Sequence, residues 1–215
     1  MSKTITQIAI QKKRKNRCSI FLDDEFAFGL DQEIILQFGL KKGDQLTEQQ
    51  IEEILLNEEK NKAKDRALKF LSYRDRSEKE IRTKLKDVGY DDKIIEWVIG
   101  ELKRLKFLDD ARFAQSYAQT QMITRPMGEY YLRRELKQKG LGAELIEQTV
   151  EKIYEEKDQF SVAKELAQQR KKRYRNIDEM KARKRLSDFL MRRGFSWDVV
   201  SEVMEHWDEN SSENS

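Results

Sequence analysis

The chain has 215 residues, of which 38% are hydrophobic and 39% are charged, and its formal net charge is +3. This lean apolar fraction disfavours one compact globule and suits a mainly helical, elongated array. The one cysteine, Cys18, excludes an internal disulfide framework, and no apolar run is long enough to span a bilayer. We therefore expect a cytoplasmic protein in which Cys18 is a small packed residue.

Residues 4–10 are rich in β-formers, and residues 18–30 alternate as a hairpin with its bend at 23–25. By parity, Ile20 and Leu22 should share a face on one arm of the hairpin, and Phe26, Phe28 and Leu30 on the other arm. Five cations separate the first strand from the hairpin and form a secondary basic patch: Lys12, Lys13, Arg14, Lys15 and Arg17. This patch either contacts phosphate or an acidic partner, or serves only solubility.

Two capping signals follow the hairpin. Asp31 should cap a short helix that ends at Phe38, and Thr47 with Gln50 forms a capping box that opens a long helix. Residues 57–64 are charged and poor in apolar side chains. We therefore predict a small N-terminal β-rich domain over residues 1–60, which includes the start of the linking helix.

Three helix exits then repeat one pattern: an apolar residue, three spacers, a glycine, a large apolar residue and a capping residue. They are Leu85–Asp91, Leu136–Gly142 and Leu190–Ser196, and their glycines, Gly89, Gly140 and Gly194, are separated by 51 and 54 residues. Glycine fits the left-handed position that ends a helix. Replacement of Gly140 by valine should therefore cost stability.

The pattern predicts three tandem three-helix repeats, at residues 61–105, 106–157 and 158–207, and an acidic, disordered tail at 208–215. Ser77 and Glu80 form a second capping box in the first repeat. The second repeat opens with a hydrophobic staple, in which Leu108 and Phe113 flank the cap Asp109. Capping explains the paired aspartates here without a metal ion.

Two groups of cations are candidates for function. In the second repeat, Arg133, Arg134 and Lys137 accompany Tyr130 and Tyr131. Such a group either clamps a nucleic-acid strand or partner loop, or consists of tyrosines wedged between repeats beside solvated arginines.

The third repeat carries the densest positive charge. From Lys164 to Arg193 there are 12 Lys and Arg against 4 Asp and Glu. The block is either a phosphate-binding surface or a solvated helix face. Its candidate contact residues are Arg170, Lys171, Lys172, Arg173, Arg175, Arg183, Lys184 and Arg185.

Several motifs occur in an order typical of one family. They are Leu68, Leu71, Arg74, Ser77, Glu80, Ile81, Lys84 and Leu85, then Leu108, Asp109, Asp110, Phe113 and Ala114, then Gly128, Leu136, Lys139 and Gly140. With these motifs the chain resembles the RecX regulatory proteins of bacteria, in the long form with a β-rich N-terminal extension.

The resemblance implies a non-enzymatic modulator of the RecA recombinase, with roles in homologous recombination, DNA repair and the SOS response. Such proteins bind in the groove of the RecA filament on single-stranded DNA and restrain filament growth, ATP hydrolysis and strand exchange. It implies contact with single-stranded DNA, direct or through the filament. It supplies no catalytic residues, and we expect no cofactor, no metal ion, no membrane partner and a monomer.

Two other classes are compatible with parts of the chain. The basic block alone would suit a stand-alone helical nucleic-acid-binding module. An enzyme is disfavoured, because the sequence has no glycine-rich phosphate loop, and its one histidine, His206, lies near the C-terminal end.

Overall fold

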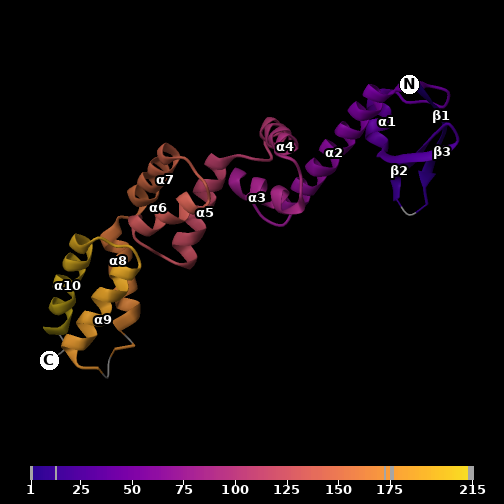
Figure 1. The fold of residues 1–215 in the computed structure, drawn as a ribbon. Coiled ribbons are helices and arrows are strands. Elements are labelled where there is room, and N and C mark those ends of the chain that lie inside the picture. Colours follow the sequence, from indigo (N-terminus) through magenta and orange to yellow (C-terminus); the bar gives the residue numbers. More distant parts are fainter. Residues whose placement is uncertain (1, 13, 172, 175–176, 213–215) are drawn as a thin grey trace. The chain divides into compact units, whose positions relative to one another are not determined.

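A computed structural model describes residues 2–12, 14–171, 173–174 and 177–212, with only the backbone for Arg14 and for 207–212 (Figure 1). The chain forms two compact units, Met1–Arg74 with Arg82–Phe107, and Asp75–Ile81 with Leu108–Ser215. The expected mainly helical fold is confirmed. Within the described residues, three three-helix repeats follow a small N-terminal domain with a four-stranded antiparallel sheet.

The N-terminal domain contains β1 (Ser2–Gln11), β2 (Arg14–Leu22), β3 (Glu25–Asp31), α1 (Gln32–Phe38) and β4 (Gln45–Thr47). The repeats contain α2 (Glu48–Leu71), α3 (Glu78–Val88) and α4 (Asp92–Arg104), then α5 (Asp110–Thr124), α6 (Glu129–Gln138) and α7 (Ala143–Glu156), then α8 (Gln159–Lys171), α9 (Glu179–Arg192) and α10 (Trp197–Ser212).

The sheet has the strand order β3-β2-β1-β4 and confirms the predicted hairpin, which joins β2 to β3. Ile20 and Leu30 are fully buried, and Cys18 is buried as expected. The prediction for Phe26 is wrong. A register shift after the Ile20–Phe28 pair places Phe26 opposite Phe21, where it is 61% exposed, because one extra residue reverses the faces of a strand.

Helix α2 runs unbroken through the charged stretch in which the sequence places a domain boundary. Its first part packs against the sheet and α1, and it also packs against α4 (Figure 1). The predicted capping box of Thr47 and Gln50 is confirmed. Glu58 is only 2% exposed, and its carboxylate accepts from the Asp31 amide and pairs with Arg17. Because these partners compensate the buried charge of Glu58, α2 can continue as a helix through residues 57–64.

The three glycine turns have the predicted left-handed conformation. The φ angles of Gly89, Gly140 and Gly194 are 98°, 85° and 85°. In each turn the glycine amide donates to the carbonyl three residues earlier, and the next amide donates to the carbonyl five residues earlier. This is the Schellman motif, which satisfies carbonyls at the end of a helix.

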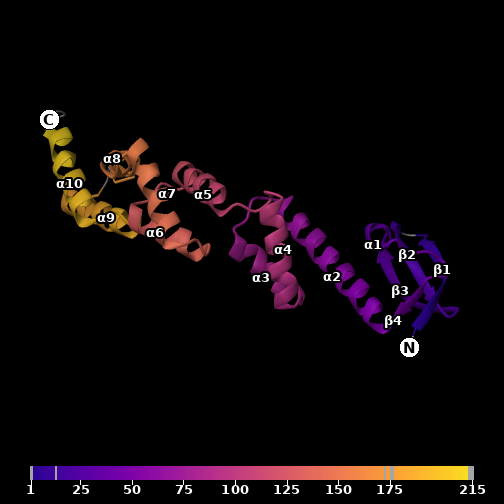
Figure 2. The same ribbon diagram turned by 90° about the horizontal axis from the view of Figure 1, so that it is seen from above.

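The start of α6 packs against the turn between α9 and α10. The Gly128 amide donates to the Arg193 carbonyl at 2.8 Å. A Cβ atom on Gly128 would overlap the Gly194 carbonyl oxygen, and one on Gly194 would lie 2.7 Å from the Tyr131 backbone nitrogen. Facing glycines therefore allow the close backbone approach that joins the second and third repeats (Figure 2).

The same arrangement recurs at the turn between α6 and α7. Ser77, which is fully buried, donates from Oγ to the Lys139 carbonyl at 2.6 Å, and Lys139 Nζ lies 2.9 Å from Glu80 Oε1. A Cβ atom on Gly140 would lie 2.5 Å from the Cβ atom of Lys79. Gly140 is therefore restricted by packing as well as by its φ angle, which adds to the expected cost of a valine there.

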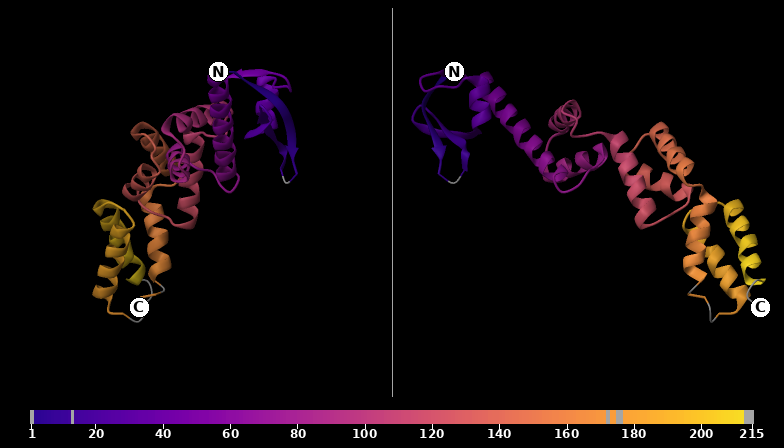
Figure 3. Two further views of the ribbon diagram at one scale, coloured as in Figure 1. Left: turned by 45° about the vertical axis from the view of Figure 1, so that its right-hand side comes forward. Right: turned by 180° about the vertical axis from the view of Figure 1, so that it is seen from behind.

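In the third repeat, α8, α9 and α10 pack on one another around a core that includes Leu186, Leu190 and Val200 (Figure 3). Helix α10 is assigned through Ser212. The expectation of a disordered tail at 208–215 stays a prediction. Residues 213–215 lie outside the described residues.

Two glycines in equivalent N-cap positions test the joint between repeats. Gly128 (φ −79°) and Gly142 (φ −69°) both lack a side-chain cap, but only Gly128 faces a packed backbone. We expect Gly128→Ala to lower the free energy of unfolding by about 1–3 kcal/mol through overpacking. Gly142→Ala meets open space and should lower it by only about 0.5 kcal/mol, the preference of an N-cap for glycine over alanine. Equal shifts in urea unfolding, followed by circular dichroism, would contradict the assigned joint.

Candidate functional site

The three predicted cations of the second repeat line one groove, formed by α6 and α7, with a volume of about 500 Å³. Arg133, Arg134 and Lys137 lie along it with Tyr130, which is 69% exposed. Leu141 and Ile146 supply apolar wall. The groove therefore offers an exposed ring beside positive charge, a combination suited to a nucleic-acid strand or an anionic loop.

The groove cations differ in their ion pairs and in their exposure. Arg133 Nη1 lies 2.6 Å from a carboxylate oxygen of Glu129, and its Nε lies 3.0 Å from one of Glu147. Partial burial opposes the charge of Arg133, but the hydrogen bonds to both carboxylates outweigh it and raise its pKa. Arg133 is thus a held cation that ties α6 to α7, whereas Arg134 and Lys137 are exposed.

A second group of cations surrounds Phe189 in the third repeat. Arg170 and Arg173 line a hollow of about 180 Å³ with Phe189 and Arg193. The guanidinium carbon of Arg170 lies 4.2 Å from the Phe189 ring centroid, and that of Arg193 lies 5.4 Å from it. Burial, and then the positive charges of Arg125 and Arg170, lower the pKa of Arg193.

Among the described residues, none of the three guanidinium groups in this hollow forms an ion pair with a carboxylate. Arg193 Nη1 instead donates to the Pro126 carbonyl at 3.3 Å. A cluster of like charges without an internal counter-charge is a ready site for an external anion. The sequence prediction omitted Arg193, although it lies in the spacer Met191-Arg192-Arg193 before Gly194.

The other third-repeat candidates that the structure describes do not line this hollow. Helix α8 ends at Lys171, and the amides of Arg173 and Tyr174 form turn hydrogen bonds. Repulsion within the run of cations disfavours another helical turn. Lys172 and Arg175 lie outside the described residues.

Arg183, Lys184 and Arg185 are exposed on α9. Arg185 shares the helix face of Phe189, four residues later, so it extends the cation cluster along α9. Arg183 and Lys184 lie on the adjoining faces of the helix.

The N-terminal basic patch is only partly a surface. Lys12 and Lys15 are exposed. Arg17 pairs with the buried Glu58 at 2.7 Å and donates to the Gly29 carbonyl at 2.9 Å, so it joins the hairpin to α2. The charge of Arg17 is therefore largely used within the fold, and a contact of Arg17 with a partner stays a prediction. Lys13 and the side chain of Arg14 lie outside the described residues.

The first aspartate of each predicted pair acts as a helix cap. Asp91 accepts from the Lys93 amide, and Asp109 accepts from the amides of Ala111 and Arg112. In the described part of the chain, no three His, Cys, Asp or Glu side chains gather where they could hold a metal ion. None of the described helices combines the length and the apolar character needed to cross a membrane.

Family models match nearly every part of the fold. The regulatory protein RecX N-terminal domain matches residues 3–47, and the first, second and third three-helix domains of RecX match residues 63–102, 109–150 and 156–204. The chain belongs to the RecX family. The three RecX domains coincide with the three repeats found in the structure.

The chain aligns with individual RecX proteins over most of their length. The chain is 38% identical to the regulatory protein RecX of Bacillus velezensis, over 97% of this chain and 80% of that protein. It is 37% identical to that of Bacillus subtilis, over 94% and 76%. A crystal structure of a regulatory protein RecX has a TM-score of 0.78 at 33% identity and covers 94% of this chain and 99% of that one.

Replacement of Arg133, which has two carboxylate partners, should cost more stability than replacement of the exposed Lys137. We expect Arg133→Gln to lower the free energy of unfolding by about 0.5–1 kcal/mol, because Glu129 and Glu147 both lose a partly exposed partner. Lys137→Gln removes the same charge and should stay within about 0.5 kcal/mol of the unaltered protein. Urea unfolding at low and high salt measures both. A loss for Lys137→Gln as large as that for Arg133→Gln would refute the distinction.

Proposed function

We propose that this protein binds RecA recombinase filaments on single-stranded DNA and restrains their growth, ATP hydrolysis and strand exchange. It acts by binding alone, without catalysing a reaction. The observation that carries the proposal is the pair of cation groups on the second and third repeats, at the α6–α7 groove and around Phe189. Membership in the RecX family supports this choice of partner.

The α6–α7 groove has the features needed to contact a nucleoprotein surface. Arg134 and Lys137 are exposed and can reach phosphates, whose neutralisation releases counterions and strengthens binding. Tyr130 presents its ring beside them and can stack on a base or pack against a partner loop. Arg133, already held by two carboxylates, keeps the groove in shape while the outer cations bind.

Restraint of the filament requires a difference in affinity between filament states. A ligand shifts a conformational equilibrium only by as much as it prefers one state. The joint at Gly128 and Gly194 holds the second and third repeats together within one unit, so their cation groups have a set separation. We propose that this spacing matches one filament geometry, which binding then favours over the geometry that extends or hydrolyses ATP.

A stand-alone nucleic-acid-binding module remains the alternative, favoured by the same basic groups. The two functions differ in their requirements. Binding to phosphate alone should weaken steeply with salt for any DNA and should need no protein partner. Recognition of a filament should in addition depend on the recombinase and its nucleotide.

Charge reversal at the groove tests the proposal. We expect Lys137→Glu to weaken binding to recombinase filaments on single-stranded DNA roughly tenfold, because it places a repelling charge at the contact. Lys152→Glu, on the exposed side of α7, makes the same change in charge and should have little effect. Fluorescence anisotropy and the filament ATPase rate, with circular dichroism as the folding control, provide the measurements. Equal behaviour of both variants would contradict the proposed contact.

The third-repeat contacts need a separate variant. We expect the double variant Arg173→Glu with Arg185→Glu to reduce affinity for the filament, for single-stranded DNA, or for both, by roughly tenfold or more. Both side chains are exposed, so the fold should be retained. Unchanged affinity for both partners would remove this cluster from the binding surface.

A further inference from the structure

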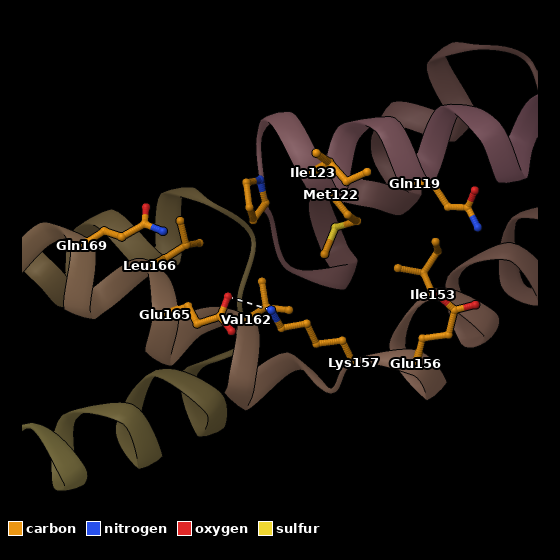
Figure 4. Close-up of a pocket in the computed structure, with 11 residues that line it drawn as sticks. Gln119, Met122, Ile123, Ile153, Glu156, Lys157, Val162, Glu165, Leu166 and Gln169 are labelled. Carbon is orange, nitrogen blue, oxygen red and sulfur yellow. Dashed lines mark hydrogen bonds and ion pairs between the residues drawn. The ribbon is translucent and has the colours of Figure 1, made fainter.

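A second groove lies on the second unit, between α5, α7 and α8, with a volume of about 600 Å³ (Figure 4). Its walls are mainly apolar: Met122 and Ile123 come from α5, Ile153 from α7, and Val162 and Leu166 from α8. Ile123 is 82% exposed and adds to this apolar lining. The family resemblance and the cation groups leave this groove unexplained.

One end of this groove opens onto the arginine cluster. Leu166 and Gln169 line both the groove and the hollow that holds Arg170, Arg173 and Arg193. Figure 4 shows Gln169 and Leu166 at one end of the groove, with Gln119 and Glu156 at the opposite end. The apolar groove therefore has one positively charged end, formed by Arg170, Arg173 and Arg193, which we call the positive pole.

The lining favours a protein segment over a nucleic acid. None of the described residues that line the apolar groove is aromatic, so they provide no platform for stacked bases. Their cation, Lys157, is paired with Glu165 at 2.6 Å, as the dashed line in Figure 4 shows. Apolar walls with charge at one end match the common case of an amphipathic helix in a groove.

We propose that this groove docks a short amphipathic segment of a partner protein, whose apolar side chains pack along Ile123 and Leu166 and whose carboxylates at one end pair with Arg170 and Arg173. The partner is defined by this chemistry alone, an apolar helical face next to acidic residues.

The positive pole is arranged in advance for carboxylates. Arg170 is stacked on the Phe189 ring, and Arg193 is held by the Pro126 carbonyl. Planar guanidinium groups bind carboxylates through two parallel hydrogen bonds, and fixed donors lose little entropy when they do so. Arg173 is exposed and completes the pole from the turn after α8.

The experiment selects peptides from a random phage-displayed library on the full chain, without recombinase or DNA. It therefore succeeds or fails separately from the proposed function. Selected peptides are synthesised, and their affinities are measured by fluorescence anisotropy against Ile123→Asp and Arg173→Glu. The matched control is Leu36→Asp, because Leu36 on α1 is 81% exposed and lies in the other unit.

We expect the selected peptides to combine apolar residues at i, i+3 or i+4 with nearby Asp or Glu. Ile123→Asp and Arg173→Glu should each weaken binding roughly tenfold or more, and Leu36→Asp should leave it unchanged. The proposal is overturned if no peptide is enriched or if the selected peptides bind Ile123→Asp as well as the unaltered chain. It is also overturned if oligodeoxythymidylate alone binds, with dependence on Arg173 and none on Ile123.

Discussion

The close backbone contact between Gly128 and Gly194 is the constraint on which the rest of the second unit depends. A helix must satisfy its last carbonyls, and the left-handed glycine at the end of α9 does so while leaving no side chain in the way of α6. Arg193, the residue before that glycine, accepts the Gly128 amide through its carbonyl. Its guanidinium belongs to the cluster around Phe189. One turn therefore ends a helix, joins two repeats and places the guanidinium of Arg193 in the cluster around Phe189.

The cations of this protein divide into those that hold the fold and those that face outward. Arg17 and Arg133 have carboxylate partners from other elements, and their charge is largely used within the chain. Lys137 and Arg173 are exposed and line hollows, so they can exchange water for an external anion. Net charge alone does not distinguish cations that are paired within the fold from cations that are exposed, because one basic stretch of sequence contains both.

Features set by neighbouring residues could be predicted from the sequence. The caps at Asp31, Thr47 and Asp109 and the glycine turns each depend on a few consecutive residues, and all have the expected geometry. The repeat spacing then gave the three-helix units. Phe26 could not be placed, because its face depends on a register shift that pairing with β2 reveals.

Features set by distant residues could not be predicted in the same way. The contact of Gly128 with Gly194, and of Ser77 with Lys139, joins segments far apart in the chain. From the sequence alone, Arg17 resembles any other surface cation. Its partner Glu58 lies on α2, far along the chain, so the ion pair between them is visible only in the structure. The apolar groove likewise depends on how α5, α7 and α8 meet. Charge density located the cation groups, but not which cations were already paired.

We propose that the second unit contacts the filament through its cation groups. Hydrogen–deuterium exchange of the full chain, with and without recombinase filaments on single-stranded DNA, measures this contact. We expect slower exchange on binding in peptides that cover α6 with the start of α7, and α8 with α9, and little change in β1–β4. Slower exchange confined to the N-terminal sheet, with these helices unchanged, would contradict it.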